Sequence, residues 1–194
     1  YLDGNPDFRE KHTDLIDAYT ALNMSRAGEV LDSTGVRYAL AYPFGENALA
    51  LDFAALGRLG GAGVGSLLGI LIHPVFGTWI SLRAAIITDA EFAEYDRPLE
   101  GFDPCPSCSK PCITACPAHT VSEDGWDWQA CMEWRLDTDE CSERCASRVA
   151  CPWGAGERYS PGQMAYHHSF VLKSVRAWLA KHPGPGRPRK KTTP

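Results

Sequence analysis

All eight cysteines of this 194-residue chain lie between Cys105 and Cys151, in two groups of four. The first group reads CPSCSKPCITACP, and the second begins at one isolated cysteine and ends in CSERCASRVACP. Three closely spaced cysteines followed by a fourth before proline are typical of the ligands of iron–sulfur clusters. The sequence therefore predicts two 4Fe–4S clusters, and the predicted ligands are Cys105, Cys108, Cys112, Cys116, Cys131, Cys141, Cys145 and Cys151.

The division of these ligands follows from the cysteine that precedes proline in each group. In two-cluster ferredoxins, that cysteine binds the cluster of the other group. By this rule, cluster 1 takes Cys105, Cys108, Cys112 and Cys151, and cluster 2 takes Cys116, Cys131, Cys141 and Cys145. The spacing is wider than the usual C-x2-C-x2-C-x3-C-P, by one residue in the first group and by more in the second. The ligand count is unaffected by this widening.

Eight cysteines could also bind zinc or form disulfides. Zinc sites with four cysteines usually contain two C-x2-C pairs, and only Cys105 and Cys108 form one here. A disulfide framework would spread its cysteines through the fold, whereas the 104 residues before Cys105 contain none. The arrangement favours a reducing compartment, and we expect a cytoplasmic protein.

Charge and hydropathy narrow the choice of partners. The net charge is −5, although the basic residues of the C-terminal tail offset part of a more acidic body, so nucleic acid is not an expected partner. Residues 59–82 carry no formal charge, and their length raises the question of a membrane span. Six glycines and a central His73-Pro74 pair would weaken and break such a helix. We therefore expect no membrane span.

The remaining patterns predict an α+β fold: a small, helix-covered sheet body, a two-cluster ferredoxin-like module and a C-terminal helix. Apolar periodicity predicts helices at 7–32, 47–59 and 161–181, and the last should have Ser160 as its N-cap. Strands are expected at 36–42, 67–72 and 78–88, the last two as buried strands around a turn at 73–77. The predicted parts are the body (1–100), the module (101–160), the closing helix (161–182) and a disordered basic tail (183–194).

Some further residues could take part in chemistry. His119 follows the first cysteine group closely and could donate a hydrogen bond near a cluster. We expect His167 and His168 on the closing helix, one packed and the other solvated. Trp126, Trp128, Trp134 and Trp153 could shield clusters from water or simply pack. The glycine run at 60–65 follows a predicted helix and precedes a strand, which is the reverse of a dinucleotide-binding motif.

A longer pattern resembles a known group of enzymes. GAGVG at 61–65, LIHPVFGTWI at 71–80 and AIITD at 85–89 precede the cysteines. This order is similar to the core of the epoxyqueuosine reductase and reductive dehalogenase group, and the likeness covers residues 60–155. YPFG at 42–45, LGILIHP at 68–74 and the Tyr159-Ser160-Pro161 segment resemble short bacterial 4Fe–4S ferredoxin-type domain proteins more closely still. The resemblance implies an electron-delivering module.

The chain departs from the reductases at the positions that carry their catalysis. Asn47 stands near the place of their proton-donating aspartate, and Ser66 or Leu67 near the place of a lysine. Their corrinoid-binding body is also much larger than residues 1–100. The primary prediction is therefore an iron–sulfur protein that passes single electrons to a redox partner protein or a bound cofactor. The alternatives are a corrinoid-dependent reductase, which would bind cobalamin, and a structural or regulatory iron–sulfur module. No catalytic residue is predicted.

Overall fold

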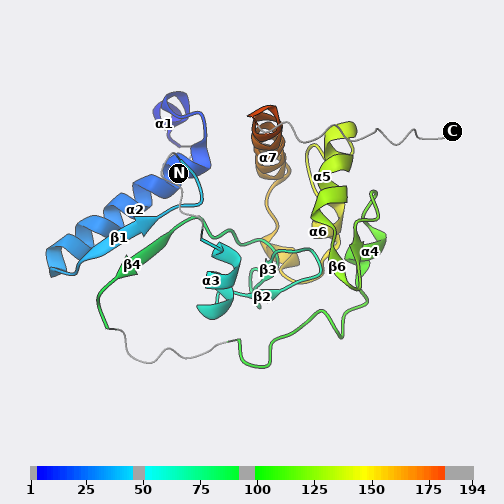
Figure 1. The fold of residues 1–194 in the computed structure, drawn as a ribbon, viewed down its shortest axis with the longest axis horizontal. Coiled ribbons are helices and arrows are strands. Elements are labelled where there is room, and N and C mark those ends of the chain that lie inside the picture. The colour runs from blue at the N-terminus through cyan, green and yellow to red at the C-terminus, as the bar shows by residue number, and fades with distance from the viewer. Residues whose placement is uncertain (1–3, 46–50, 92–98, 182–194) are drawn as a thin grey trace. The chain divides into compact units, whose positions relative to one another are not determined.

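The computed structural model describes residues 4–45, 51–91 and 99–181, the last four as backbone only. The chain is α+β, as predicted (Figure 1). Its helices are α1 (Pro6–Lys11), α2 (Leu15–Thr34), α3 (Phe53–Leu59), α4 (Pro111–Thr114), α5 (Trp128–Asp137), α6 (Ala146–Ala150) and α7 (Pro161–Lys181), with a 3-10 turn at Ala155–Glu157. The strands form three antiparallel pairs: β1 (Tyr38–Ala41) with β4 (Ala85–Thr88), β2 (Val64–Gly65) with β3 (Leu71–Ile72), and β5 (Val121–Ser122) with β6 (Gly125–Trp126).

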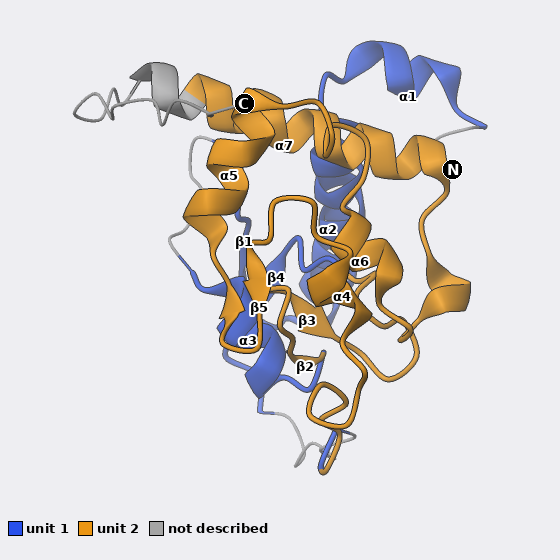
Figure 2. Ribbon diagram, turned by 90° about the vertical axis from the view of Figure 1, so that its right-hand side faces the viewer, with its two compact units in different colours: residues 1–62, 81–100 blue, residues 63–80, 101–194 orange. Residues whose placement is uncertain are grey.

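The chain divides into two compact units, which meet at the predicted boundary between residues 100 and 101 but differ from the prediction in where residues 63–80 belong (Figure 2). Unit 1 contains residues 1–62 and 81–100, whereas unit 2 contains residues 63–80 and 101–194. The segment 63–80 thus belongs to the cysteine module rather than to the body. Its Leu68 is buried in one cluster with Cys116 and Val121, which explains this assignment. The predicted tail, 183–194, lies outside the described residues.

Unit 1 is built from α1, α2, α3, β1 and β4, and its first helix is shorter than predicted. The predicted helix 7–32 is interrupted because His12 adopts an extended conformation and Asp14 caps a new helix. The Asp14 carboxylate accepts hydrogen bonds from the backbone N–H groups of Ile16 and Asp17, both at 3.0 Å. These two N–H groups lie in the first turn of α2 and have no carbonyl partner within that helix, so the Asp14 carboxylate supplies their acceptor.

The predicted strand pair around residues 73–77 is wrong. The turn itself exists, because His73 and Gly77 exchange two backbone hydrogen bonds of 2.8 Å. The flanking segments do not pair with each other, however. β3 contains only two residues and pairs with β2, while β4 begins at Ala85 and pairs with β1 in the other unit. The segment was predicted as strands because it is apolar. Thr78 and Trp79 are indeed buried, but by packing within unit 2 and not in a pair of strands.

The predicted closing helix is confirmed as α7, with bounds Pro161–Lys181. The Ser160 hydroxyl accepts a hydrogen bond of 3.2 Å from the backbone N–H of Gln163, as an N-cap does. The prediction that a helix ends at the glycine pair 60–61 is also confirmed by α3. Within the described part of the chain, none of the helices combines the length and apolar character that crossing a membrane requires.

Arg148 on α6 joins the segment 78–79 to the cysteine module. Its Nε donates a 3.0 Å hydrogen bond to the carbonyl of Thr78. The guanidinium also lies over the ring of Trp79, 4.4 Å from the ring centroid, and 5.2 Å from that of Tyr159. One side chain thus connects three segments of unit 2 that are distant in sequence.

Replacing Arg148 with methionine should therefore destabilise unit 2. The Thr78 carbonyl would lose its charged donor, and the aromatic rings would lose their cation, which together should cost about 2 kcal/mol or more. Urea unfolding followed by circular dichroism measures this loss. Arg144→Met, at an exposed arginine four residues away, is the control and should unfold at nearly the same urea concentration as the parent protein. Equal midpoints for the two variants would contradict the assigned role.

Candidate metal centres in the cysteine module

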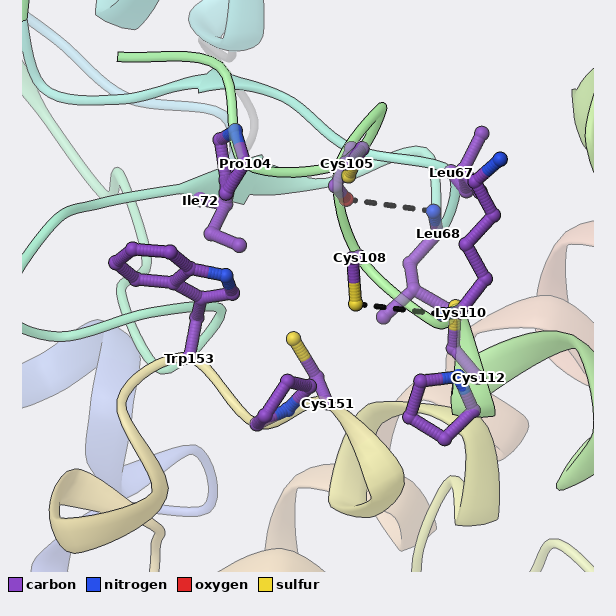
Figure 3. Close-up of a pocket in the computed structure, with 13 residues that line it drawn as sticks. Leu67, Leu68, Ile72, Pro104, Cys105, Cys108, Lys110, Cys112, Cys151 and Trp153 are labelled. Carbon is purple, nitrogen blue, oxygen red and sulfur yellow. Dashed lines mark hydrogen bonds between the residues drawn. The ribbon is translucent and has the colours of Figure 1, made fainter.

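Four cysteines surround one cavity in unit 2 (Figure 3). They are Cys105, Cys108, Cys112 and Cys151, which we call the first centre. The cavity measures about 350 Å³, including space open to solvent, and its other walls include Leu68, Ile72 and Trp153. Cys105 and Cys108 come from the loop that leads into α4, Cys112 lies in α4 itself, and Cys151 directly follows α6. The cavity thus gathers three thiols of the first sequence group and the last thiol of the second.

Local backbone geometry explains how the loop presents its thiols. The Cys108 N–H donates to the Cys105 carbonyl at 3.3 Å, which closes a turn between these two residues. Lys110 then adopts the left-handed conformation, with φ 55°, and its N–H donates to the Cys108 sulfur at 3.3 Å (Figure 3). Pro111 starts α4 and so places Cys112 in its first turn. A backbone N–H directed at a cysteine sulfur is a contact that stabilises a thiolate.

The other four cysteines also lie near one another, as their mutual electrostatic influence indicates. We call Cys116, Cys131, Cys141 and Cys145 the second centre. The pKa of Cys141 is raised by burial and, beyond that, by negative charge on Cys145, Cys131 and Cys116. Burial likewise raises the pKa of Cys145, with further contributions from Cys131 and Cys116.

The cavity of the first centre contains the four cysteines that the spacing rule assigns to cluster 1, while the division of ligands between two clusters and iron binding stay predictions. The packing of α4 against α6 explains the crossing. α4 contains Cys112, in the first centre, and ends two residues before Cys116, in the second. α6 has Cys145 as its N-cap, in the second centre, and Cys151 as its C-cap, in the first. Each helix thus carries one cysteine to each centre.

The thiols line the walls of a cavity rather than meeting at a point. In the described residues, no three His, Cys, Asp or Glu side chains are arranged to hold one metal ion. Binding of one zinc ion by four cysteines requires all four sulfurs at about 2.3 Å from it. In a 4Fe–4S cluster, by contrast, four cysteine thiolates bind a cluster of four irons.

Cys116 differs from the other buried thiols because hydrogen-bond donors surround it. Burial alone would raise the pKa of Cys116, but hydrogen bonds from Thr120 outweigh this effect and lower it. The backbone N–H and the hydroxyl of Thr120 both lie 3.4 Å from the Cys116 sulfur. Ser147 also helps to lower the pKa, and its buried hydroxyl makes no hydrogen bond of normal geometry. These donors favour the thiolate at this position.

Cluster assembly should accelerate as the pH rises from neutral to mildly alkaline values. Burial and neighbouring thiolates raise the pKa values of Cys112, Cys151, Cys141 and Cys145 above the usual 9.0. These thiols are therefore protonated at neutral pH, and metal binding must release their protons. The rate of anaerobic reconstitution from iron and sulfide, followed by visible absorption at several pH values, measures the effect. A rate independent of pH would contradict thiol ionisation as the controlling step.

The predicted histidine roles are only partly matched. His119 is exposed, with φ 51°, and its backbone N–H donates to the Cys116 carbonyl at 3.1 Å. The prediction of one packed and one solvated histidine on α7 is wrong, because His167 and His168 are both partly buried. His167 stacks on Tyr159, with ring centroids 5.0 Å apart. Both histidines are half-covered because this face of α7 packs on the module.

Other predicted residues are placed as follows. Trp126, Trp128 and Trp153 are all exposed, although Trp153 also lines the first centre, and Trp134 is partly buried. Ser66 also lines the first centre, and its hydroxyl donates a 2.7 Å hydrogen bond to the Ile70 carbonyl. Asn47 lies outside the described residues.

Sequence reasoning missed the buried Arg135, the partly buried Arg148 and a histidine contact near the second centre. Arg135 follows Cys131 by four residues on α5, so both share one helix face. Arg148 lies between Cys145 and Cys151 on α6. His168 Nδ1 lies 3.0 Å from the Cys141 carbonyl oxygen. The i, i+4 spacing on α5 was the available signal for Arg135, whereas nothing local marks the contact of His168.

No protein-family model, no curated protein and no solved structure matches this chain. The resemblance to the epoxyqueuosine reductase and reductive dehalogenase group, and to short ferredoxin-type proteins, therefore stays a prediction from the motifs.

Proposed function

We propose that this chain binds two 4Fe–4S clusters, one at each centre, and transfers single electrons to a redox partner protein or a bound cofactor. The observation that carries the proposal is the grouping of the eight cysteines. Cys105, Cys108, Cys112 and Cys151 line one cavity, and the remaining four influence one another's pKa values, which supports two sets that each include one cysteine from the other sequence group. This crossed arrangement is how two-cluster ferredoxins share their ligands.

The surroundings of the thiols fit such clusters. Thiolates are the soft donors that iron–sulfur clusters require. Backbone N–H groups already donate to the sulfurs of Cys108 and Cys116. Two further donors, the Ser147 hydroxyl and Arg135 Nε, are buried without a hydrogen-bond partner. Buried donors usually have partners, and thiolate or sulfide sulfur at the second centre would provide them.

The connection between the centres supports electron relay. α4 and α6 each join a cysteine of the first centre to a cysteine of the second, so the two proposed clusters share two short helices as scaffold. Cys112 and Cys116 are only four residues apart in sequence. Clusters held in this way can exchange an electron with little change in protein geometry.

A reductive titration tests the proposal. Anaerobically purified protein should take up about two electrons per chain, one for each cluster, and should return them to a small-molecule oxidant with recovery of its visible spectrum. Repeated cycles should leave the iron content unchanged. Protein that contains both clusters but takes up no electrons reversibly would contradict electron transfer and favour a structural role for the clusters.

A further inference from the structure

Arg135 is a buried cation with no anionic side chain beside it. It is 8% exposed, lies on α5, and forms no ion pair with a carboxylate of the described residues. Its Nε has no hydrogen-bond partner. A buried charge without a counter-charge costs several kcal/mol, and buried arginines are therefore almost always paired. Some negative charge should thus accompany Arg135 in the functional protein.

His168 does not supply that charge. Its Nδ1 lies 3.0 Å from the Cys141 carbonyl oxygen, and a carbonyl only accepts hydrogen bonds, so Nδ1 carries the proton. The Arg135 guanidinium lies 3.3 Å from this same protonated Nδ1 and can donate only to the His168 carbonyl, at 3.4 Å. His168 thus positions the Cys141 loop and the guanidinium, while the positive charge stays uncompensated.

The thiolates of the second centre are the anionic groups within reach. Arg135 and the Cys141 carbonyl both lie beside His168 Nδ1, at 3.3 and 3.0 Å, and the positive charge of Arg135 partly offsets the burial and neighbouring thiols that raise the pKa of Cys141. Arg148 behaves similarly. It is partly buried, forms no ion pair with a described carboxylate, and its charge interacts with Cys145. Two arginines without carboxylate partners thus lie near the cysteines of the second centre.

Less uncompensated positive charge lies near the first centre than near the second. Lys110 interacts with Cys108 and Cys105, but its ammonium is paired with the carboxylate of Glu123. Arg158 acts on Cys151 from an exposed position, where water screens its charge. The two centres thus differ in uncompensated buried positive charge, which is concentrated at the second.

We propose that Arg135 and Arg148 are the counter-charges of the second centre, and that they hold the reduction potential of its cluster above that of the first. This inference rests on the proposed function. Reduction adds one electron, and so one negative charge, to a cluster, and a nearby buried cation stabilises that charge. The first electron taken up by the chain therefore resides at the second centre. With clusters bound at both centres, this order would direct electrons from Cys105, Cys108, Cys112 and Cys151 toward the second centre.

A redox titration monitored by electron paramagnetic resonance tests this order. The Cys151→Ser variant identifies the first centre, because changing one of its ligands should shift its potential only. We expect the lower of the two potentials to shift in this variant, and the higher to stay. A shift of the higher potential would overturn the inference.

Charge variants test the arginines themselves. Arg135→Gln should lower the higher potential and bring the two potentials closer together, whereas Arg135→Lys, which keeps the charge, should restore most of the gap. Arg144→Gln is the matched control, since it removes an exposed positive charge adjacent to Cys145 and should change either potential much less. Arg148→Met should lower the same potential as Arg135→Gln, which gives an independent second variant if the first loses its cluster.

The outcomes separate this inference from the proposed function. Equal effects of Arg135→Gln and Arg144→Gln, or a drop in the lower potential only, would overturn the role of the arginines while leaving two functional clusters. Loss of the second cluster from Arg135→Gln, with retention in Arg135→Lys, would support a counter-charge that the cluster needs. A parent protein that binds no iron would overturn both proposals.

Discussion

Replacing Cys151 with alanine should remove the cluster of the first centre and leave that of the second. Cys151 belongs to the second group in sequence, but its side chain lines the cavity of Cys105, Cys108 and Cys112. A cluster held by only three cysteines dissociates more readily, so the iron content should fall from about eight to about four atoms per chain. Metal analysis gives the number, and electron paramagnetic resonance shows which of the two signals disappears.

The reciprocal variant is the control for this result. Cys116→Ala should remove the cluster of the second centre, because Cys116 lies with Cys131, Cys141 and Cys145. The two variants should therefore lose different signals, each on the side opposite to the sequence group that was changed. Loss of the second-centre signal from Cys151→Ala would mean that the ligands are not crossed.

Gly77→Ala should destabilise unit 2 by about 3 kcal/mol or more. Gly77 has φ 54°, and a Cβ added there would lie 1.9 Å from the Trp153 carbonyl oxygen. Gly154 faces the same contact, since its added Cβ would lie 2.4 Å from backbone atoms of Phe76. Two backbone segments that are distant in sequence thus touch directly, and neither can move aside without disturbing Trp153 at the first centre. Thermal unfolding followed by circular dichroism measures the effect.

Gly65→Ala provides the comparison within the same unit. A Cβ at Gly65 meets no atom within 4 Å, and its φ is not positive. This substitution should change the free energy of unfolding by less than about 1 kcal/mol. Because the backbone of Gly77 packs directly against that of Trp153, Gly77→Ala should also lose iron faster on heating than Gly65→Ala. Matching melting temperatures for the two variants would show that the close backbone contact does not form.

The parts of the fold that the sequence predicts well depend on local chemistry. The closing helix starts after Ser160 because a hydroxyl N-cap and a proline at the first helical position act within four residues. The end of α3 at the glycine pair is equally local. Such signals lie in the residues themselves and need no knowledge of the rest of the chain.

The errors arise where distant segments decide the structure. The segment 63–80 reads as buried strands because it is apolar, but it packs in unit 2 through Leu68 and through the close approach of Gly77 to Trp153. The carbonyl of Thr78 also receives its hydrogen bond from Arg148, 70 residues further along the chain. Local periodicity contains no information about these partners, so it cannot distinguish such a segment from a strand pair.

The candidate site shows the same contrast. The division of the cysteines follows from a spacing rule and agrees with the cavity of the first centre. The buried charges could not be predicted, because Arg135 and Arg148 look like ordinary surface residues of short helices until their burial is known. Cobalamin binding and the reductase alternative rest on the motif resemblance alone and stay predictions.

Metal and sulfide analysis shows whether the eight cysteines hold two 4Fe–4S clusters. Protein purified without oxygen should contain about eight irons and about eight acid-labile sulfides per chain, with little zinc. Protein with about two zinc ions and no sulfide would mean that the cysteines bind zinc instead of clusters.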